Sequence, residues 1–227
     1  MKNTGFELEA FTRPIANVAI NGGVVYANTK YRDDLVGANG NPLSPALFQL
    51  PGRQISNAPK WTVTGSMAWT PPIGSSGLRG LVYADIRHMS GFNTGSDLDV
   101  EKEQGSTSVV NARAGIHGPE DAWAIEIWAQ NLFDKNYQQV AFDSPIQGTP
   151  GSTTRAVQAG FFTRATQLYN AFIAEPRTFG VTLRGKLSFS PRQAPAYEPL
   201  PAPPPPVVEQ PAPPPPPPPP PPAPERG

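Results

Sequence analysis

Regularly spaced acidic side chains are the first candidates for chemistry in this 227-residue chain. Asp97, Asp99, Glu101 and Glu103 alternate within one polar stretch. Their carboxylate oxygens could bind Ca²⁺, which prefers several oxygen ligands. Alternating acidic residues in a polar stretch need no ion, however, so we favour a solvated acidic loop and predict no metal site.

No combination of residues predicts a catalytic site or a bound cofactor. His88 and His117 are the two histidines, and neither has a partner at the spacing of metal ligands, so each is interpreted as a polar side chain near a strand end. Cysteine is absent, which excludes disulfides, thiol catalysis and thiolate metal ligands. Gly148, Gly151 and Gly160 lack the strand-to-helix context of a phosphate-binding loop. We therefore expect that the protein is not an enzyme.

The elements that position the polar side chains are strands with a two-residue period. In Thr178–Phe189, which reads TFGVTLRGKLSF, odd positions are apolar or glycine and even positions are polar or glycine. Such a strand has one apolar face and one polar face. Six earlier segments show the same alternation: Thr4–Thr12, Asn17–Tyr31, Ala58–Thr70, Gly77–Ser90, Ser106–Gly118 and Ala122–Asn131. The sequence thus predicts an all-β fold of about seven antiparallel strands.

The connections between these strands alternate in length. They are short near 13–16, 71–77 and 118–121, and long near 32–56, 91–105 and 132–176. This alternation is typical of outer-membrane barrels, which have short periplasmic turns and long extracellular loops. Most of the predicted strands also exceed the ~5–6 residues of soluble strands and reach the ~9–11 needed to cross a bilayer.

The two faces of the strands indicate which side meets lipid. We expect the rows that contain Val63, Ile125 and Phe179 to face lipid, with Trp61 and Trp69 near the two edges of the apolar band. The charged strand residues, from Glu7 and Glu9 to Arg184 and Lys186, lie on the opposite face. A soluble β-sandwich, the alternative, would instead require the apolar rows to face each other.

Composition excludes other classes. The formal net charge is zero, which argues against nucleic acid as a partner. The N-terminal residues show no apolar signal-peptide core, and no stretch is apolar for long enough to form a transmembrane helix.

Charges on the inner face of such a barrel are candidates for ligand binding. The inner face would present Arg79, Asp85, Arg87, Arg113, Glu126 and Arg184. Near the extracellular rim, such charges would select an anionic or polar ligand, and we name Arg87, Glu126 and Arg113 as the ligand-binding candidates. Arg87 and Glu126 are expected toward the extracellular ends of their strands. The alternative, which we rank first, is that the inner charges pair with each other or with a surface inside the barrel.

The longest connection contains a helical pattern. Val157, Phe161, Ala165, Leu168 and Phe172 recur at spacings of 4, 4, 3 and 4. This spacing predicts a short amphipathic helix within residues 156–173.

Several segments together resemble a known family. NLFDKNY (Asn131–Tyr137) follows the strand AWAIEIWAQ, and EPRTFGVTLRGKLSF (Glu175–Phe189) comes forty residues later. With NAPKWTVTGSMAW (Asn57–Trp69) and VNARAGI (Val110–Ile116), they resemble the C-terminal end of a TonB-dependent outer-membrane receptor over nearly all of residues 5–189. That family consists of energised importers of siderophores, vitamins and sugars.

The resemblance implies a place, partners and a domain plan. It implies the Gram-negative outer membrane and the last seven strands of a barrel of ~22 strands that surrounds a plug. The implied partners are outer-membrane lipid, the barrel assembly machinery (which reads a terminal aromatic such as Phe189), a small ligand such as a siderophore or saccharide, and TonB through an N-terminal plug.

We expect two regions: residues 1–189 as a partial barrel and residues 190–227 as a disordered proline-rich tail in the periplasm. The tail contains ten consecutive prolines at 213–222, which favour polyproline II. Because no plug precedes the first strand and ~8 strands are the smallest usual barrel, we expect a receptor fragment that is not competent for transport alone. The alternative is an autonomous structural outer-membrane β-protein with a periplasmic proline-rich tether.

Overall fold

A computed structural model describes residues 1–186. The predicted end of the last strand at Phe189 and the predicted tail 190–227 lie outside the described residues.

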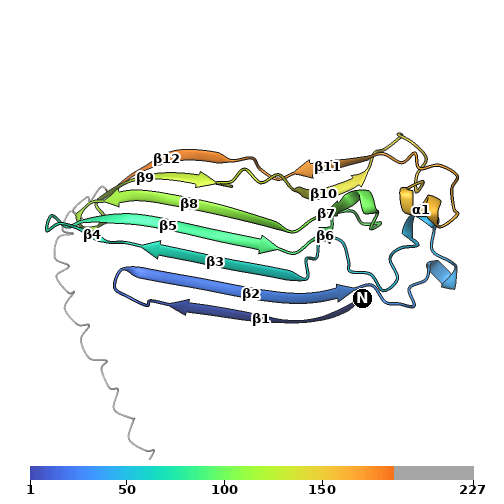
Figure 1. Cartoon of the computed structure of the whole chain (residues 1–227), viewed down its shortest axis with the longest axis horizontal. Coiled ribbons are helices and arrows are strands. Elements are labelled where there is room, and N and C mark those ends of the chain that lie inside the picture. The colour runs from blue at the N-terminus through green and yellow to red at the C-terminus, as the bar shows by residue number, and fades with distance from the viewer. Residues whose placement is uncertain (187–227) are drawn as a thin grey trace, which may run out of the picture. The chain divides into compact units, whose positions relative to one another are not determined.

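The main element is an antiparallel sheet in which every long strand pairs with the next long strand along the chain (Figure 1). Its seven long strands are β1 (Lys2–Thr12), β2 (Val18–Lys30), β3 (Trp61–Trp69), β5 (Leu78–Met89), β8 (Thr107–His117), β9 (Trp123–Gln130) and β12 (Thr178–Gly185), and the short β4 (Pro72–Ile73) pairs with β5. The seven strands expected from the alternation of residues are therefore confirmed.

The register of the strands places the apolar rows on one face. Val24 lies opposite Val63, and Ile125 lies opposite both Ile116 and Leu183. These side chains are not covered by other parts of the described chain; Phe179, for example, is 81% exposed. The face-to-face packing that a soluble β-sandwich requires is therefore not found among residues 1–186.

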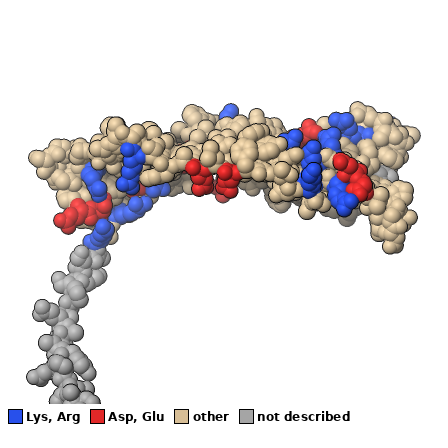
Figure 2. Space-filling view, turned by 90° about the horizontal axis from the view of Figure 1, so that it is seen from below, with Lys and Arg blue, Asp and Glu red and all other residues tan. Residues whose placement is uncertain are grey.

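The charged strand residues project almost entirely from the opposite, inner face. Successive side chains of a strand point to opposite faces. The paired positions therefore place on the inner face Glu7, Glu9, Arg87, Glu126 and Arg184. In Figure 2 acidic side chains of the near strands project from the concave side of the curved sheet. The prediction fails for Lys30. It belongs to the outer face with Phe6 and Tyr26, as does its partner Lys2, which precedes the first predicted strand.

Both edges of the sheet are open within the described residues. There, β1 pairs only with β2, and β12 pairs only with β9. Residues 1–186 thus form a wall with two free edges and not a closed barrel.

The long connections gather at one end of the sheet and carry structure of their own (Figure 1). They contain two small hairpins, β6 (Phe92–Asn93) with β7 (Glu103–Gln104) and β10 (Gln138–Asp143) with β11 (Tyr169–Ile173), the short helix α1 (Thr154–Gln158), and the 3-10 turns η1 (Ala38–Gly40), η2 (Pro45–Leu47) and η3 (Val100–Lys102). The 3-10 turn η4 (Pro119–Asp121) lies in the short connection between β8 and β9. We call the end with the long connections the loop end and the opposite end the turn end.

The prediction of a helix within residues 156–173 is wrong for most of that range. α1 ends at Gln158, and Gly160 has a φ of +83° that the right-handed helix cannot continue through. Further along, Phe172 lies in β11 opposite Val140, and its ring is 5.6 Å from that of Phe142. Tertiary pairing between β10 and β11 therefore overrides the helical spacing.

Among the described residues, the helices are too short or too polar to cross a lipid bilayer.

Candidate functional site

A buried carboxylate joins three strands on the inner face of the sheet. Glu126 in β9 is 1% exposed. Its Oε1 accepts a hydrogen bond from Arg184 Nη1 in β12 at 3.1 Å and lies 3.1 Å from His117 Nε2 in β8. Its Oε2 lies 3.3 Å from Arg113 Nη1, also in β8. We call these four residues the Glu126 cluster.

A glycine makes room for the carboxylate. Gly115 in β8 lies directly opposite Glu126 in the register. A Cβ at Gly115 would lie 2.4 Å from the Ile125 carbonyl oxygen and 2.8 Å from Glu126 Cγ. The Glu126 side chain can therefore lie against the sheet only because position 115 has no side chain.

The charges continue from the cluster to the turn end. His117 Nδ1 lies 3.2 Å from Asp121 Oδ1, and Arg79 Nη2 donates to the same oxygen at 2.7 Å. The Arg79 guanidinium, together with His117, holds the pKa of the Asp121 carboxyl below its ordinary value.

The structure brings together two of the three predicted ligand-binding residues. Arg113 and Glu126 form an ion pair with each other in the Glu126 cluster. This agrees with the alternative that we ranked first, in which the inner charges pair with each other. Glu126 also lies in the middle of β9 and not toward its loop end, where the prediction placed it. Arg87 stands apart, exposed near the loop end of β5, with its Nη2 3.4 Å from Tyr137 Oη.

His117 is the member of the cluster that sequence reasoning missed. The signal was available, because a short turn at 118–121 places position 117 opposite 124 and therefore on the same face as 126.

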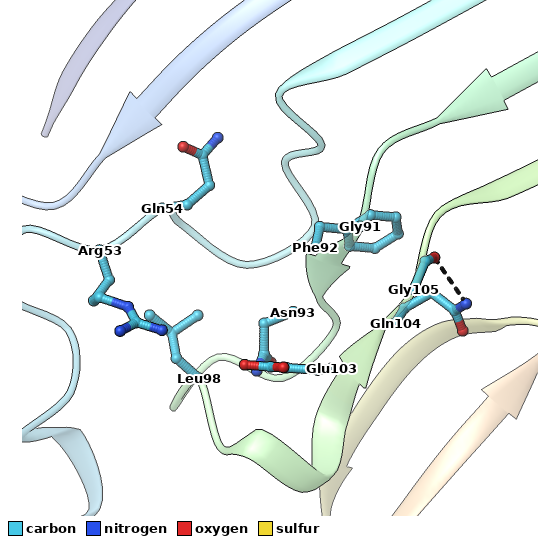
Figure 3. Close-up of a pocket in the computed structure, with 9 residues that line it drawn as sticks. All are labelled: Arg53, Gln54, Gly91, Phe92, Asn93, Leu98, Glu103, Gln104 and Gly105. Atoms are coloured by element: carbon cyan, nitrogen blue, oxygen red, sulfur yellow. Dashed lines mark hydrogen bonds between the residues drawn. The ribbon is translucent and has the colours of Figure 1, made fainter.

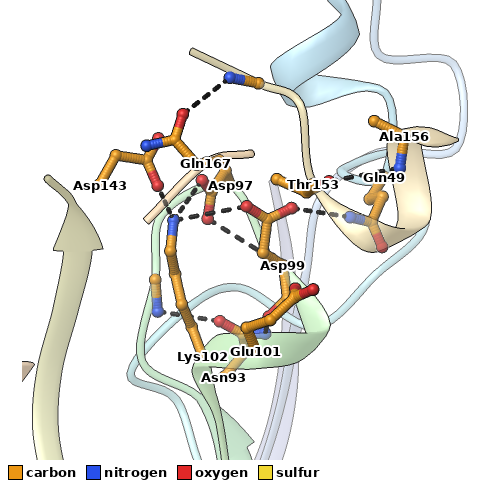
Figure 4. Close-up of polar contacts among 12 residues, drawn as sticks. Gln49, Asn93, Asp97, Asp99, Glu101, Lys102, Asp143, Thr153, Ala156 and Gln167 are labelled. Atoms are coloured by element: carbon orange, nitrogen blue, oxygen red, sulfur yellow. Dashed lines mark hydrogen bonds and ion pairs between the residues drawn. The ribbon is translucent and has the colours of Figure 1, made fainter. Parts of the chain in front are cut away.

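A second charged cluster lies in the loops (Figure 4). Lys102 is 2% exposed, and its Nζ donates to Asp97 Oδ2 at 2.5 Å and to Asp143 Oδ1, while Asp99 Oδ2 lies 3.5 Å away. Gln49 Nε2 also donates to Asp99 Oδ1 at 3.2 Å. The expected solvated acidic loop is therefore wrong for Asp97 and Asp99, which are 7% and 3% exposed.

We call Asp97, Asp99, Lys102 and Asp143 the loop cluster, and its positive charge comes from the protein itself. Oxygens of Asp97, Asp99 and Asp143 lie within 4.8 Å of one another, a spacing at which carboxylates can hold a metal ion. In this chain the ammonium group of Lys102 lies among them and supplies a positive charge. The arrangement ties η3 to β10 and so joins two of the long connections.

Charge and burial shift the pKa values in this cluster. Burial raises the pKa of Asp99 to about 7, and the negative charge of Asp97 adds to the effect. Burial by itself would lower the pKa of Lys102, but the hydrogen bonds and charges of Asp143 and Asp97 outweigh it and raise that pKa.

Two neighbouring hollows lie where the first long connection meets the β6–β7 hairpin. One has a volume of about 370 Å³, and in Figure 3 Arg53 and Gln54 line it on one side and Asn93, Glu103 and Gln104 on the other. The other, of about 450 Å³, shares Arg53 and Gln54 and extends to the ends of β2 and β3.

Comparison with known proteins places the fold. No protein-family model matches the chain, and no curated protein matches it significantly. Among solved structures, the ferric yersiniabactin uptake receptor FyuA from Yersinia pestis has 18% identity and a TM-score of 0.53, covering 79% of this chain and 22% of that chain. The siderophore receptor PiuA from Acinetobacter baumannii has 19% identity and a TM-score of 0.53, covering 80% and 21%.

The chain thus spans about a fifth of the length of these two receptors. At this level of identity the likeness concerns the fold. The sheet of seven long strands is a segment of an antiparallel β-barrel wall, as the residue alternation predicted.

The Glu126 cluster should couple β9 to β12. In a double-mutant cycle of Glu126→Gln and Arg184→Gln, we expect each single change to lower the free energy of unfolding by about 1.5–3 kcal/mol, the range for hydrogen bonds to charged groups. The two effects should be strongly non-additive, because both changes remove one shared interaction. Denaturant titration in detergent micelles, followed by tryptophan fluorescence, measures both quantities. Additive losses would show that the pair is not coupled.

Asp99 should make the loop cluster sensitive to pH. Its pKa is about 7 in the folded cluster and ~3.9 in an unfolded chain, so the folded state binds the Asp99 proton more tightly. The stability of the cluster should therefore be full below about pH 4 and should fall as the pH rises from ~4 to ~7.

Asp99→Asn should remove this decline. Hydrogen exchange of residues 94–104 at pH 5 and pH 8, corrected for the intrinsic exchange rates, measures it. Asp34→Asn, at an exposed position paired with Arg32, serves as the matched control and should behave like the unchanged chain. An identical pH response of the chain and Asp99→Asn would contradict the assignment.

Proposed function

We propose that this chain forms part of the wall of an outer-membrane receptor barrel of the TonB-dependent class, which serves the uptake of a small ligand. The observation that carries the proposal is the division of a single sheet into an uncovered apolar face and a charged face. A contiguous apolar surface that extends over seven long strands is rare on soluble monomers. In a bilayer the same surface faces hydrocarbon, while the charged face lines a water-filled interior.

The dimensions of the apolar face fit a bilayer. Trp61 and Trp69 lie at the two ends of β3 on the outer face, eight residues apart. At ~3.3 Å per residue and a tilt of ~40°, they are separated by roughly 20 Å along the barrel axis. The rings of Phe6 and Tyr26 pack against Trp61, with centroids 5.9 and 4.7 Å from that of the indole. Aromatic side chains of this kind form the girdles at both membrane surfaces.

The lengths of the connections support an orientation in the membrane. Long loops of such barrels are extracellular and short turns are periplasmic, so the loop end would face the outside of the cell. β12 runs from the loop end to the turn end, and the proline-rich segment 190–227 that follows it would enter the periplasm.

The free edges of β1 and β12 support a larger barrel. In hydrocarbon every backbone N–H and C=O group must be paired, and barrels usually have at least ~8 strands. We propose that further strands pair with both edges, and that the barrel assembly machinery inserts the complete wall. Energised uptake in this class also uses a plug that contacts TonB, and no such domain is present among residues 1–186. Transport would therefore depend on a plug supplied from outside these residues.

The ligand class rests on the two similar receptors and on Arg87. One receptor is described as taking up ferric yersiniabactin and the other as a siderophore receptor, which favours an iron-bearing ligand of the siderophore kind over a saccharide. Arg87 is exposed on the inner face near the loop end, where its guanidinium can contact an anionic ligand. Arg113 and Glu126 would contribute by holding the wall together, because they already pair with each other.

A charge placed on the outer face tests the membrane assignment. Ile86 lies opposite Gly65, midway between Trp61 and Trp69, so Ile86→Arg should cost ~2–4 kcal/mol in the bilayer. Ser66 lies at nearly the same depth on the inner face, opposite Asp85. Ser66→Arg should therefore lower the free energy of unfolding little. Urea titration of the chain in phosphatidylcholine vesicles measures both. Equal losses for the two variants would contradict the membrane placement.

A further inference from the structure

Lys102 brings a buried amine into contact with carboxyl groups. It is among the largest fully buried side chains of the described residues. Its Nζ donates to Asp97 Oδ2 at 2.5 Å and to Asp143 Oδ1, and Asp99 Oδ2 lies 3.5 Å from it (Figure 4). Lysine amines act as nucleophiles toward carbonyl carbons. The contact between Lys102 and Asp97 is therefore also a starting geometry for the formation of an amide bond.

The backbone around this contact holds the two side chains together. A Cβ at Gly95 would overlap Lys102 Cδ and would lie 3.0 Å from Asp97 Oδ1, so only glycine leaves room for both groups. Gly95 N donates to Asn93 Oδ1 at 2.8 Å. Thr94 N and Thr94 Oγ1 both donate to the Lys102 carbonyl oxygen, at 2.9 and 2.8 Å. Little further ordering is therefore needed to bring the reacting atoms together.

The other two carboxyl groups of the loop cluster can move the protons that a condensation requires. Burial and the charge of Asp97 raise the pKa of Asp99 to about 7, so below that pH the Asp99 carboxyl group carries a proton. Asp99 N donates to Asp97 Oδ1 at 3.4 Å, which keeps these two residues adjacent. Asp143 accepts a hydrogen bond from Nζ, and its side chain is 37% exposed. It can therefore take a proton from the ammonium group and exchange it with water.

We propose that Lys102 and Asp97 condense to form an amide bond within the chain. Nζ passes one proton to Asp143, and its electron pair then attacks Asp97 Cγ. Asp99 protonates the Asp97 oxygen that leaves, and the bond between Cγ and this oxygen breaks. In total, Nζ loses two protons to the departing water molecule and keeps one, so Asp99 and Asp143 return to their starting states. Neither an oxidant nor a reductant is required.

Burial favours the neutral product. A buried ion pair carries a desolvation cost that a neutral amide does not. The side chains of Lys102 and Asp97 are 2% and 10% exposed, so little water can reach the new bond and hydrolyse it. Asp143 is the less favourable acceptor because its carboxyl group is partly exposed to water. Hydrogen bonds and charges raise the pKa of Lys102, so the neutral amine is scarce and the reaction should be slow compared with folding.

Mass spectrometry of the full-length protein tests for the bond. The chain is held unfolded in urea, refolded into detergent micelles at pH ~6, below the pKa of Asp99, and sampled over time. Trypsin cleaves after a free lysine but not after an acylated one. Residues 88–113 contain both Asp97 and Lys102, and Lys102 is the one internal cleavage site of this peptide. The bond should therefore leave the peptide uncut and lighter by one water molecule.

The intact mass should fall by one water molecule in the refolded chain and stay unchanged in urea. Asp99→Asn keeps the amine and the acceptor but removes the proton donor, so the rate should fall by ~10²–10⁴-fold. Asp34→Asn, which changes an exposed carboxyl group paired with Arg32, is the matched control and should react at the rate of the unchanged chain.

The pH dependence tests the role of Asp99 without a substitution. The rate of the unchanged chain should decline as the pH rises through about 7, where Asp99 loses its proton. This measurement decides the role of Asp99 if the Asp99→Asn variant does not fold.

Three results would overturn the inference. The first is an unchanged mass with normal cleavage after Lys102 in the refolded chain. The second is a link between peptides 88–113 and 136–155, which would place the bond at Asp143. The third is a rate that falls neither in folded Asp99→Asn nor with rising pH, which would leave no role for the proton donor. None of these measurements depends on the membrane placement of the sheet.

Discussion

The structure depends on one constraint, the fixed alternation of side chains along paired antiparallel strands. Because neighbouring strands are in register, the choice of face made by one residue is shared by its partners on both sides. Val63, Ile125 and Leu183 therefore belong to one continuous apolar surface, and Glu126 and Arg184 to one polar surface. A shift of one residue in β9 or β12, for example, would place Glu126 or Arg184 among the apolar rows.

This division leaves little apolar material for an interior, and the buried positions show the consequence. The largest fully buried side chains among the described residues are polar: Lys102, Glu126, Thr94 and Ser152. The Glu126 cluster joins β8, β9 and β12, and the loop cluster around Lys102 joins two long connections. Buried charges of this kind are tolerated only when they are paired, and in both clusters the partners come from separate segments of the chain. Ion pairs thus hold together parts that a soluble domain would join by hydrophobic packing.

The sequence alone predicted the seven strands, their faces and the alternation of short and long connections, because a two-residue period is a local property. It did not predict what the long connections do. Asp97 and Asp99 seemed solvated because their partners, Lys102 and Asp143, are brought in by tertiary contacts. The helical spacing that ends at Phe172 was misleading because β11 pairs with β10. The pairing of Arg113 with Glu126 could be anticipated from the faces, but the burial of Glu126 over Gly115 required the register.

The most direct test of the account asks which medium each face of β3 meets. The chain has no cysteine, so single cysteines can be placed along residues 61–69 and labelled with a nitroxide in lipid vesicles. Collision with oxygen, which concentrates in hydrocarbon, and with a water-soluble nickel complex can then be compared at each position. The account predicts that odd positions respond to oxygen and even positions to nickel, with a period of two. A uniform response along the strand, or high nickel accessibility at the odd positions, would contradict it.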